Sequence, residues 1–101
     1  MKIVVNRRFG GFGLSHEAAR ELGLKIVTTQ ETYGSFTYIE GQYELKRDDP
    51  KLVAVVEKLG EAANGDHAEL EVVDVPEKHW YIHEYDGLEH IVASDSPIKN
   101  Y

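Results

Sequence analysis

The chain has 101 residues, of which 42% are hydrophobic and 29% charged, and this length accommodates one compact domain. The composition excludes a long disordered chain, and no apolar run approaches the roughly 20 residues that a membrane span requires. There is no cysteine, so disulfides, thiolate chemistry and cysteine-bound zinc are excluded. We expect no signal peptide, because the opening MKIVVNRR becomes polar after three apolar residues.

The net charge of −7 is unevenly distributed along the chain. Residues 1–50 hold seven basic and seven acidic side chains, whereas residues 51–101 hold four lysines and eleven carboxylates. An acidic surface repels phosphate backbones, so we expect no direct binding to a nucleic-acid polymer. Two partners remain: a small anionic ligand held by a local arginine cluster, or a basic protein.

The first half of the chain is predicted to form a strand, a short helix, a second strand and a hairpin. Residues 2–6 are rich in β-branched side chains, which is typical of a buried strand. Ser15 and Gly23 are favourable end residues for a helix over 16–22, and residues 24–28 form the second strand. A hairpin over 36–45, turning at Glu40-Gly41, would place four apolar or aromatic side chains on one core face: Phe36, Tyr38, Tyr43 and Leu45.

The second half is predicted to form a helix, a strand and another hairpin. Asp49 is the expected N-cap, Pro50 occupies the first helical position, and apolar residues recur at helical spacing as far as Ala63. Asn64-Gly65 is expected to end this helix. A strand follows over 68–75, then a hairpin over 80–94 that turns at Asp86-Gly87, and residues 94–101 are predicted to form a flexible tail.

The predicted order of elements is therefore β-α-β-β-β-α-β-β-β. It indicates one α+β domain spanning residues 1–101, with a mostly antiparallel sheet and helices on one face.

The segment between the first strand and the first helix has features of an anion-binding loop. Its glycines let backbone N–H groups approach an anion, and the helix N-terminus adds partial positive charge. Two arginines suit phosphate, and two phenylalanines suit a stacked base. The candidate ligand-binding residues are Asn6, Arg7, Arg8, Phe9, Gly10, Gly11, Phe12, Gly13 and Ser15. The loop matches neither a Walker A loop nor G-x-G-x-x-G, and the alternative is a tight connection with its phenylalanines in the core and its arginines in solvent.

The C-terminal hairpin provides a second candidate surface. With Asp86-Gly87 as its turn, His83 lies opposite His90 on a face that also carries aromatic side chains. The candidate partner surface consists of Tyr81, His83, Tyr85, Asp86 and His90. His83 and His90 are also candidate metal ligands, but the pattern supplies no third ligand, so we predict no metal site and no cofactor.

Segments at both ends of the chain, and further segments between Arg47 and Pro76, resemble a family of small bacteriophage and prophage proteins. The opening has the pattern KIVxNxxxGGFxLS, from Lys2 to Ser15, and the C-terminal hairpin has the pattern WxIxEYDG, from Trp80 to Gly87. Residues 24–45 carry no part of the resemblance, and the family's cysteine near the position of Arg8 is missing. The resemblance implies a role in the cytoplasm of an infected bacterium and supplies no mechanism.

Together these features favour a non-enzymatic counter-defence protein, with homo-oligomerisation possible. In the leading hypothesis it holds a phosphorylated nucleotide-type ligand at the arginine–glycine loop. In the alternative it inhibits a basic host protein, such as a nuclease or CRISPR effector, through its acidic C-terminal half. A third hypothesis is a metal-assisted hydrolase that uses His83 and His90 with Asp48.

Overall fold

Strand β1 (Lys2–Asn6) passes through the interior, and both of its faces are covered. The computed structural model describes residues 1–76 and 79–94. Ile3, Val4 and Val5 are all fully buried, with Val4 on one side of the strand and the other two side chains on the opposite side. A strand that is buried on both faces typically has consecutive apolar residues in its sequence, and β1 has three of them in Ile3, Val4 and Val5.

The remaining elements follow the α+β pattern with antiparallel strand pairs, as predicted. In chain order they are helix α1 (His16–Leu22), strands β2 (Ile26–Glu31) and β3 (Gly34–Ile39), 3-10 helix η1 (Gln42–Glu44), helix α2 (Pro50–Leu59), 3-10 helix η2 (Gly60–Ala63), and strands β4 (Leu70–Asp74), β5 (His79–Tyr85) and β6 (Leu88–Ser94). Among the described residues the strands form three antiparallel pairs, β1–β4, β2–β3 and β5–β6.

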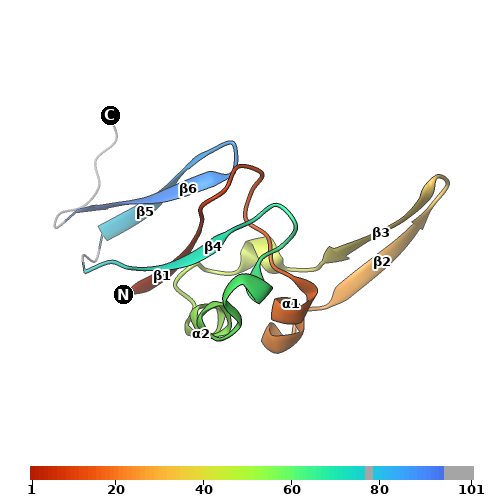
Figure 1. Ribbon diagram of the computed structural model, residues 1–101, viewed down its shortest axis with the longest axis horizontal. Coiled ribbons are helices and arrows are strands. Elements are labelled where there is room, and N and C mark those ends of the chain that lie inside the picture. The colour runs from red at the N-terminus through yellow and green to blue at the C-terminus, as the bar shows by residue number, and fades with distance from the viewer. Residues whose placement is uncertain (77–78, 95–101) are drawn as a thin grey trace.

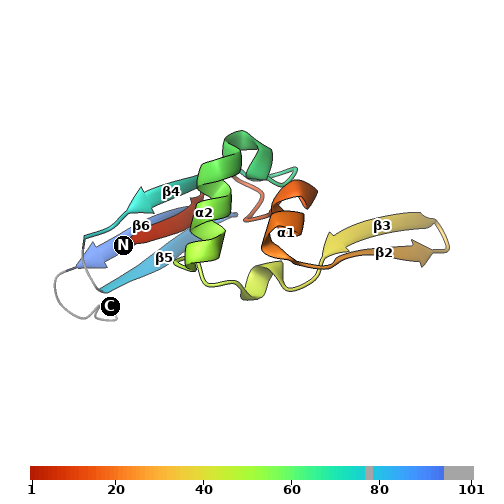
Figure 2. The ribbon, with the colours of Figure 1, turned by 90° about the horizontal axis from the view of Figure 1, so that it is seen from below.

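The β1–β4 pair is the middle layer of three (Figure 1). Helix α2 covers one face, with α1 packed beside it, and there Val4 packs with Leu52, Val56 and Phe12 in the larger core cluster. The β5–β6 hairpin covers the other face, where Ile3 and Val5 pack with Ile82 and other hairpin residues. Figure 2, seen from the helix side, shows α2 lying across the strands with α1 beside it.

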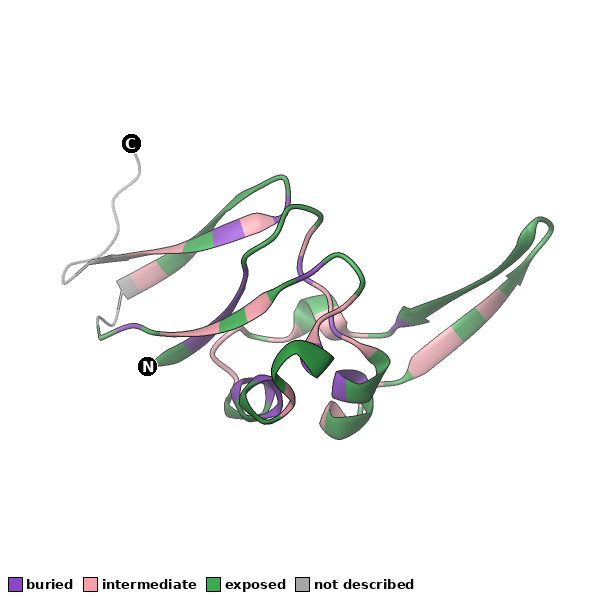
Figure 3. Ribbon diagram, viewed as in Figure 1, coloured by how far each residue is buried: buried purple, intermediate pink, exposed green. Residues whose placement is uncertain are grey.

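Strands β2 and β3 form a two-stranded arm, residues 26–39, that projects from the body (Figure 1). Only its base belongs to the core: Ile39 is buried, and Ile26 packs against the larger cluster. Figure 3 shows the outer part of the arm as exposed, and every residue from 30 to 38 is exposed.

Several local predictions are confirmed. Ser15 caps α1 by accepting a hydrogen bond from Ala18 N–H, and Gly23 ends the helix with φ 73°. Asp49 caps α2 by accepting from Lys51 N–H. In the last hairpin, Asp86 (φ 53°) and Gly87 (φ 90°) form the turn, so His83 lies opposite His90.

The predicted hairpin over 36–45 is wrong. Strand β3 pairs with β2 through a turn at Thr32-Tyr33, so Phe36 lies opposite Thr29 and Tyr38 opposite Val27. Gly41 adopts φ 82° and starts η1, so the chain does not return as a second strand. The expected core face does not form: Phe36, Tyr38 and Tyr43 are exposed, and only Leu45 packs against the core.

Other element boundaries also differ from prediction. Helix α2 ends at Leu59 because Gly60, with φ 57°, interrupts it, and the chain continues as η2 to the buried Ala63. The strand expected over 24–28 is β2, which runs from Ile26 to Glu31, and the strand expected over 68–75 is β4. The tail expected at the C-terminal end lies, beyond Ser94, outside the described residues.

The edge of β1 that faces away from β4 is closed by a buried ion pair. Val4 N–H donates to the Arg47 carbonyl at 2.8 Å, and Asn6 N–H donates to Glu89 Oε1 at 2.8 Å. The Arg47 guanidinium donates to both carboxylate oxygens of Glu89, at 2.8 Å for Nη2 to Oε2. The Glu89 side chain is only 7% exposed, so this pair links β6 to β1 inside the molecule.

Arg47→Met should lower the free energy of unfolding by about 3–5 kcal/mol, because it leaves the buried Glu89 carboxylate without its partner. Urea denaturation followed by circular dichroism measures this loss. Lys58→Met is the matched control: it removes an exposed pair with Glu21 and should change stability by less than about 1 kcal/mol. Similar losses in the two variants would contradict the buried character of the Arg47–Glu89 pair.

Candidate functional site

Asn6 fixes the start of the loop that was expected to bind a ligand. Its side chain is fully buried: Nδ2 donates to the carbonyls of Arg8 and Gly87, both at 2.7 Å, and Oδ1 accepts from Glu69 N–H at 2.9 Å. Both amide hydrogens and the amide oxygen therefore have partners within the protein. Asn6 joins the loop, the hairpin turn and the start of β4, and it presents no polar atom to a ligand.

The glycine loop, residues 10–13, packs tightly against two other segments. Gly10 N–H donates to the Asp86 carbonyl, and Gly65 N–H donates to the Gly13 carbonyl, each at 2.9 Å. A Cβ at Gly87 would lie 2.1 Å from the Gly11 nitrogen, so only glycine fits this turn. Close packing of the backbone therefore accounts for much of the glycine content in this region.

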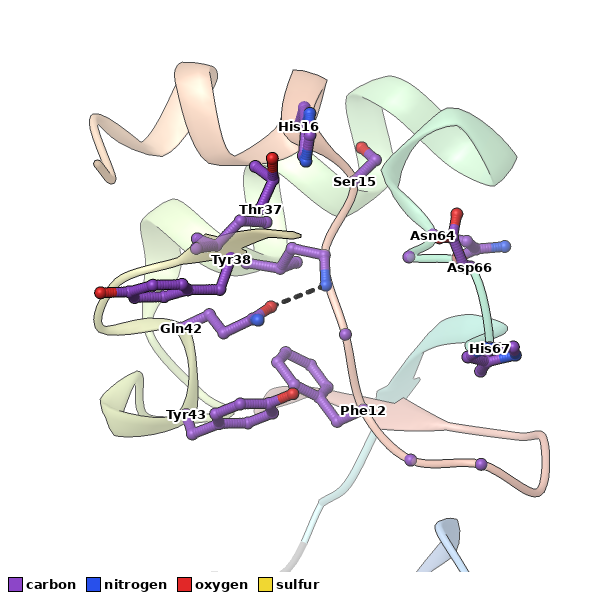
Figure 4. Close-up of a pocket in the computed structure, with 16 residues that line it drawn as sticks. Phe12, Ser15, His16, Thr37, Tyr38, Gln42, Tyr43, Asn64, Asp66 and His67 are labelled. Carbon is purple, nitrogen blue, oxygen red and sulfur yellow. Dashed lines mark hydrogen bonds between the residues drawn. The ribbon is translucent and has the colours of Figure 1, made fainter. Parts of the chain in front are cut away.

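A cleft of about 530 Å³ lies along this loop, and we call it the glycine-loop cleft (Figure 4). Its lining comes from residues 10–16, from the arm base and η1, and from residues 64–67. Figure 4 shows Tyr38, Gln42 and Tyr43 on one side of the loop and Asp66 and His67 on the other. Gln42 Oε1 accepts from Leu14 N–H at 3.0 Å and so ties η1 to the loop.

The glycine-loop cleft combines aromatic, imidazole and backbone groups. Tyr38 and Tyr43 supply aromatic surface, and His16 and His67 supply imidazoles. Neither arginine nor lysine occurs among the described residues that line it. The cleft therefore suits a planar, polar molecule better than a highly charged anion.

Arg7 and Arg8 lie in a different place. They line a second cleft of about 630 Å³, the arginine cleft, together with Glu61, Glu69, Glu71 and residues of the 64–70 segment. Arg7 Nε donates to Glu71 Oε2 at 2.9 Å, and Arg7 Nη1 donates to the Glu89 carbonyl at 3.2 Å. The structure thus does not bring these arginines into the glycine-loop cleft.

The other candidate loop residues divide between core and surface. Phe12 is buried, with the Arg47 guanidinium 3.8 Å above its ring centre, whereas Phe9 is exposed and meets Tyr85 edge-on at 6.4 Å. The Ser15 hydroxyl donates to the Ala62 carbonyl at 2.6 Å while capping α1. Of the two phenylalanines, only Phe9 is accessible to a partner.

The β5–β6 hairpin presents the second candidate surface as expected from its register. Trp80, Ile82 and Ile91 pack toward β1, so the alternate residues face away from it. Four exposed side chains on this outward face form what we call the hairpin strip: Tyr81, His83, Tyr85 and His90. Asp86 is exposed at the turn, and the rings of His83 and His90 are 4.8 Å apart between centres. In the part of the chain that the structure describes, no three His, Asp or Glu side chains are grouped to hold a metal ion.

Sequence reasoning missed the arm as a surface. Tyr33 at its tip is fully exposed, Phe36 is 51% exposed and Tyr38 is 43% exposed. The predicted hairpin over 36–45 placed Phe36 and Tyr38 on a core face, but no layer covers the arm within the described residues. The sequence signal for this surface is that β3, unlike the other strands, contains no charged residue.

Comparison with protein-family models, curated proteins and solved structures finds no match to this chain in any of the three. Over residues 1–76 and 79–94, no helix has the length and apolar character needed to cross a membrane.

Gly65→Ala should destabilise the protein by roughly 1–3 kcal/mol, because the new Cβ would lie 2.9 Å from the Gly13 carbonyl carbon and force the two segments apart. Gly13→Ala is its control. Its Cβ would meet only the Gly65 Cα at 4.0 Å, and its φ lies outside the left-handed region, so stability should stay constant or rise slightly. Thermal unfolding of both variants measures the difference, and equal losses would contradict the close approach at Gly65.

Proposed function

We propose that this chain is a non-enzymatic binding protein that docks on a basic protein through the hairpin strip. The observation that carries the proposal is the outward face of β5–β6. It exposes Tyr81, His83 and Tyr85 along β5 and His90 opposite His83 on β6, and Phe9 contacts Tyr85 edge-on. Tyrosine is enriched at the energetic centres of protein interfaces, since its ring buries apolar area and its hydroxyl forms hydrogen bonds.

The charge of the C-terminal half of the chain supports a basic partner. Residues 59–76 and 79–94 contain eight carboxylates and neither lysine nor arginine. Glu71, Asp74 and Glu89 have cationic partners from the N-terminal half of the chain. The other five make no ion pair within the described residues: Glu61, Asp66, Glu69, Glu84 and Asp86. Such a field accelerates encounter with a positively charged protein and repels nucleic acid.

The resemblance to small phage proteins gives this binding a biological setting. We propose that the partner is a basic bacterial protein of host defence, such as a nuclease or CRISPR effector, met in the cytoplasm of the infected cell. Binding alone would inhibit such a protein by covering its nucleic-acid surface, because carboxylates compete for the cations that contact phosphates.

Tyr81→Ala/Tyr85→Ala should abolish capture of basic proteins from a bacterial lysate by the immobilised chain, because two central aromatic contacts are lost. The captured proteins should be released between about 50 and about 500 mM salt, as long-range charge attraction is screened. Mass spectrometry of the eluted proteins measures both effects.

The matched control is Tyr33→Ala/Tyr43→Ala, which removes two other exposed tyrosines that lie outside the hairpin. It should capture the same proteins as the unaltered chain. Docking through the strip would be contradicted if capture persisted without Tyr81 and Tyr85, or if it did not depend on the salt concentration.

A second candidate function rests on the glycine-loop cleft. We infer that it can hold a nucleotide-type ligand, with the base against Tyr38 or Tyr43 and the phosphate toward His16 and the loop backbone. Its volume lies in the range of small-molecule sites. The nearby arginine cleft offers Arg7 and Arg8 as an alternative place for the phosphate.

Thermal shift against linear and cyclic nucleotides tests this candidate. A ligand at 100 times its Kd stabilises the native state by about 2.7 kcal/mol, which raises the Tm of a domain this small by about 10 °C or more. Tyr38→Ala/Tyr43→Ala should remove the shift if the base lies in the glycine-loop cleft, whereas loss only in Arg7→Ala/Arg8→Ala would indicate that the ligand binds in the arginine cleft. A panel without any shift would eliminate the nucleotide candidate.

A further inference from the structure

One face of the arm is apolar and exposed to solvent. In antiparallel pairs the side chains of opposed residues share a face, so Val27, Phe36 and Tyr38 lie on one face of the arm. The Phe36 and Tyr38 rings are 6.1 Å apart between centres, and both are substantially exposed. The opposite face is polar, with the Thr28 and Thr37 hydroxyls joined by a 3.1 Å hydrogen bond.

Both long edges of the arm are also open. Across the described residues, neither β2 nor β3 pairs with a third strand. Alternate residues of an edge strand point their backbone N–H and C=O groups outward, where another strand can bind them. Proteins normally protect such edges with lysine, proline or a bulge, but β3 contains neither charge nor proline.

We propose that a second copy of this chain pairs with the open β3 edge of the arm. The two β3 strands pair edge to edge and antiparallel across a twofold axis, forming a four-stranded sheet in the order β2-β3-β3-β2. An antiparallel contact between identical edges is compatible with a twofold axis. If a residue of one copy contacts a second residue in the partner, the partner makes the same contact in return. The aromatic faces of the two arms then join into one continuous surface.

The charge distribution favours a second copy over an unrelated occupant. Glu31 is the single charged residue between Ile26 and Ile39, whereas the whole chain carries −7. Two acidic molecules meet with the least repulsion where each is nearly neutral, and the arm is such a place. It also holds the bodies apart, because it projects away from them (Figure 1).

The pairing joins the two β3 edges through backbone hydrogen bonds and brings the aromatic side chains of the two copies onto one face of the four-stranded sheet. Aromatic neighbours on adjacent strands stabilise the pairing in addition to the hydrogen bonds of the new ladder.

Sedimentation analysis over a wide concentration range tests the pairing. The unaltered chain should have twice the 11.4 kDa mass of one copy. Phe36→Lys should reduce the mass to that of one copy, because it brings two ammonium groups to the paired strands. The Tm of this variant should equal that of the unaltered body, because Phe36 lies outside both core clusters.

Thr29→Lys is the matched control. Thr29 is the cross-strand partner of Phe36 on the same face, but it belongs to β2, the outer strand of the proposed sheet. This variant should remain dimeric. A monomeric unaltered chain, a dimer that survives Phe36→Lys, or a dimer lost only with Thr29→Lys would each overturn the proposal. Because the test needs neither lysate nor nucleotide, its result is independent of the hairpin strip and of both clefts.

Discussion

The fold depends on how the backbone of β1 is hydrogen-bonded along the edge that faces away from β4. Its other edge pairs with β4, so without further partners the central strand would leave buried N–H groups unbonded. The Arg47 carbonyl and the Glu89 carboxylate accept from Val4 and Asn6, and the two side chains bind one another. The Arg47 main chain and the Arg47–Glu89 ion pair thus together take the place of a third strand, and they fix the segment before α2, strand β1 and strand β6 in a single arrangement. Because the Arg47–Glu89 pair is buried, separating the two side chains would cost much stability, and this disfavours other arrangements of the three segments.

This arrangement determines which surfaces are available for function. With β6 held at β1, the hairpin turn lies against the glycine loop, and Gly87 and Gly11 are in backbone contact. The loop is therefore a packing element whose outer side borders a cleft, and its glycines do not by themselves indicate an anion site. The same docking turns Tyr81 and Tyr85 outward. Packing thus weakens the case for a phosphate loop and strengthens the case for a protein-binding surface.

Sequence predicted the parts of the fold that local chemistry determines. The ends of α1 at Ser15 and Gly23 and the turn at Asp86-Gly87 follow from capping and from positive φ, which depend on a few adjacent residues. The arm could not be predicted in the same way. Gly41 permits positive φ in a turn or at the start of a 3-10 helix, and the choice depends on the distant contact between Gln42 and Leu14. The separation of the arginines from the glycine loop is likewise set by long-range packing.

The aromatic residues of the arm show why alternation alone does not identify a core. Alternation establishes that Phe36 and Tyr38 share a face, but a second layer must exist to bury that face. In the body, α2 and the hairpin provide such layers on the two sides of β1. The arm extends beyond both, and no element among the described residues covers its apolar face. A second copy fits this nearly neutral end, and the hairpin strip lies on the body, away from the arm. Pairing through the arms would therefore leave both strips free, and one dimer could hold two basic partners at once.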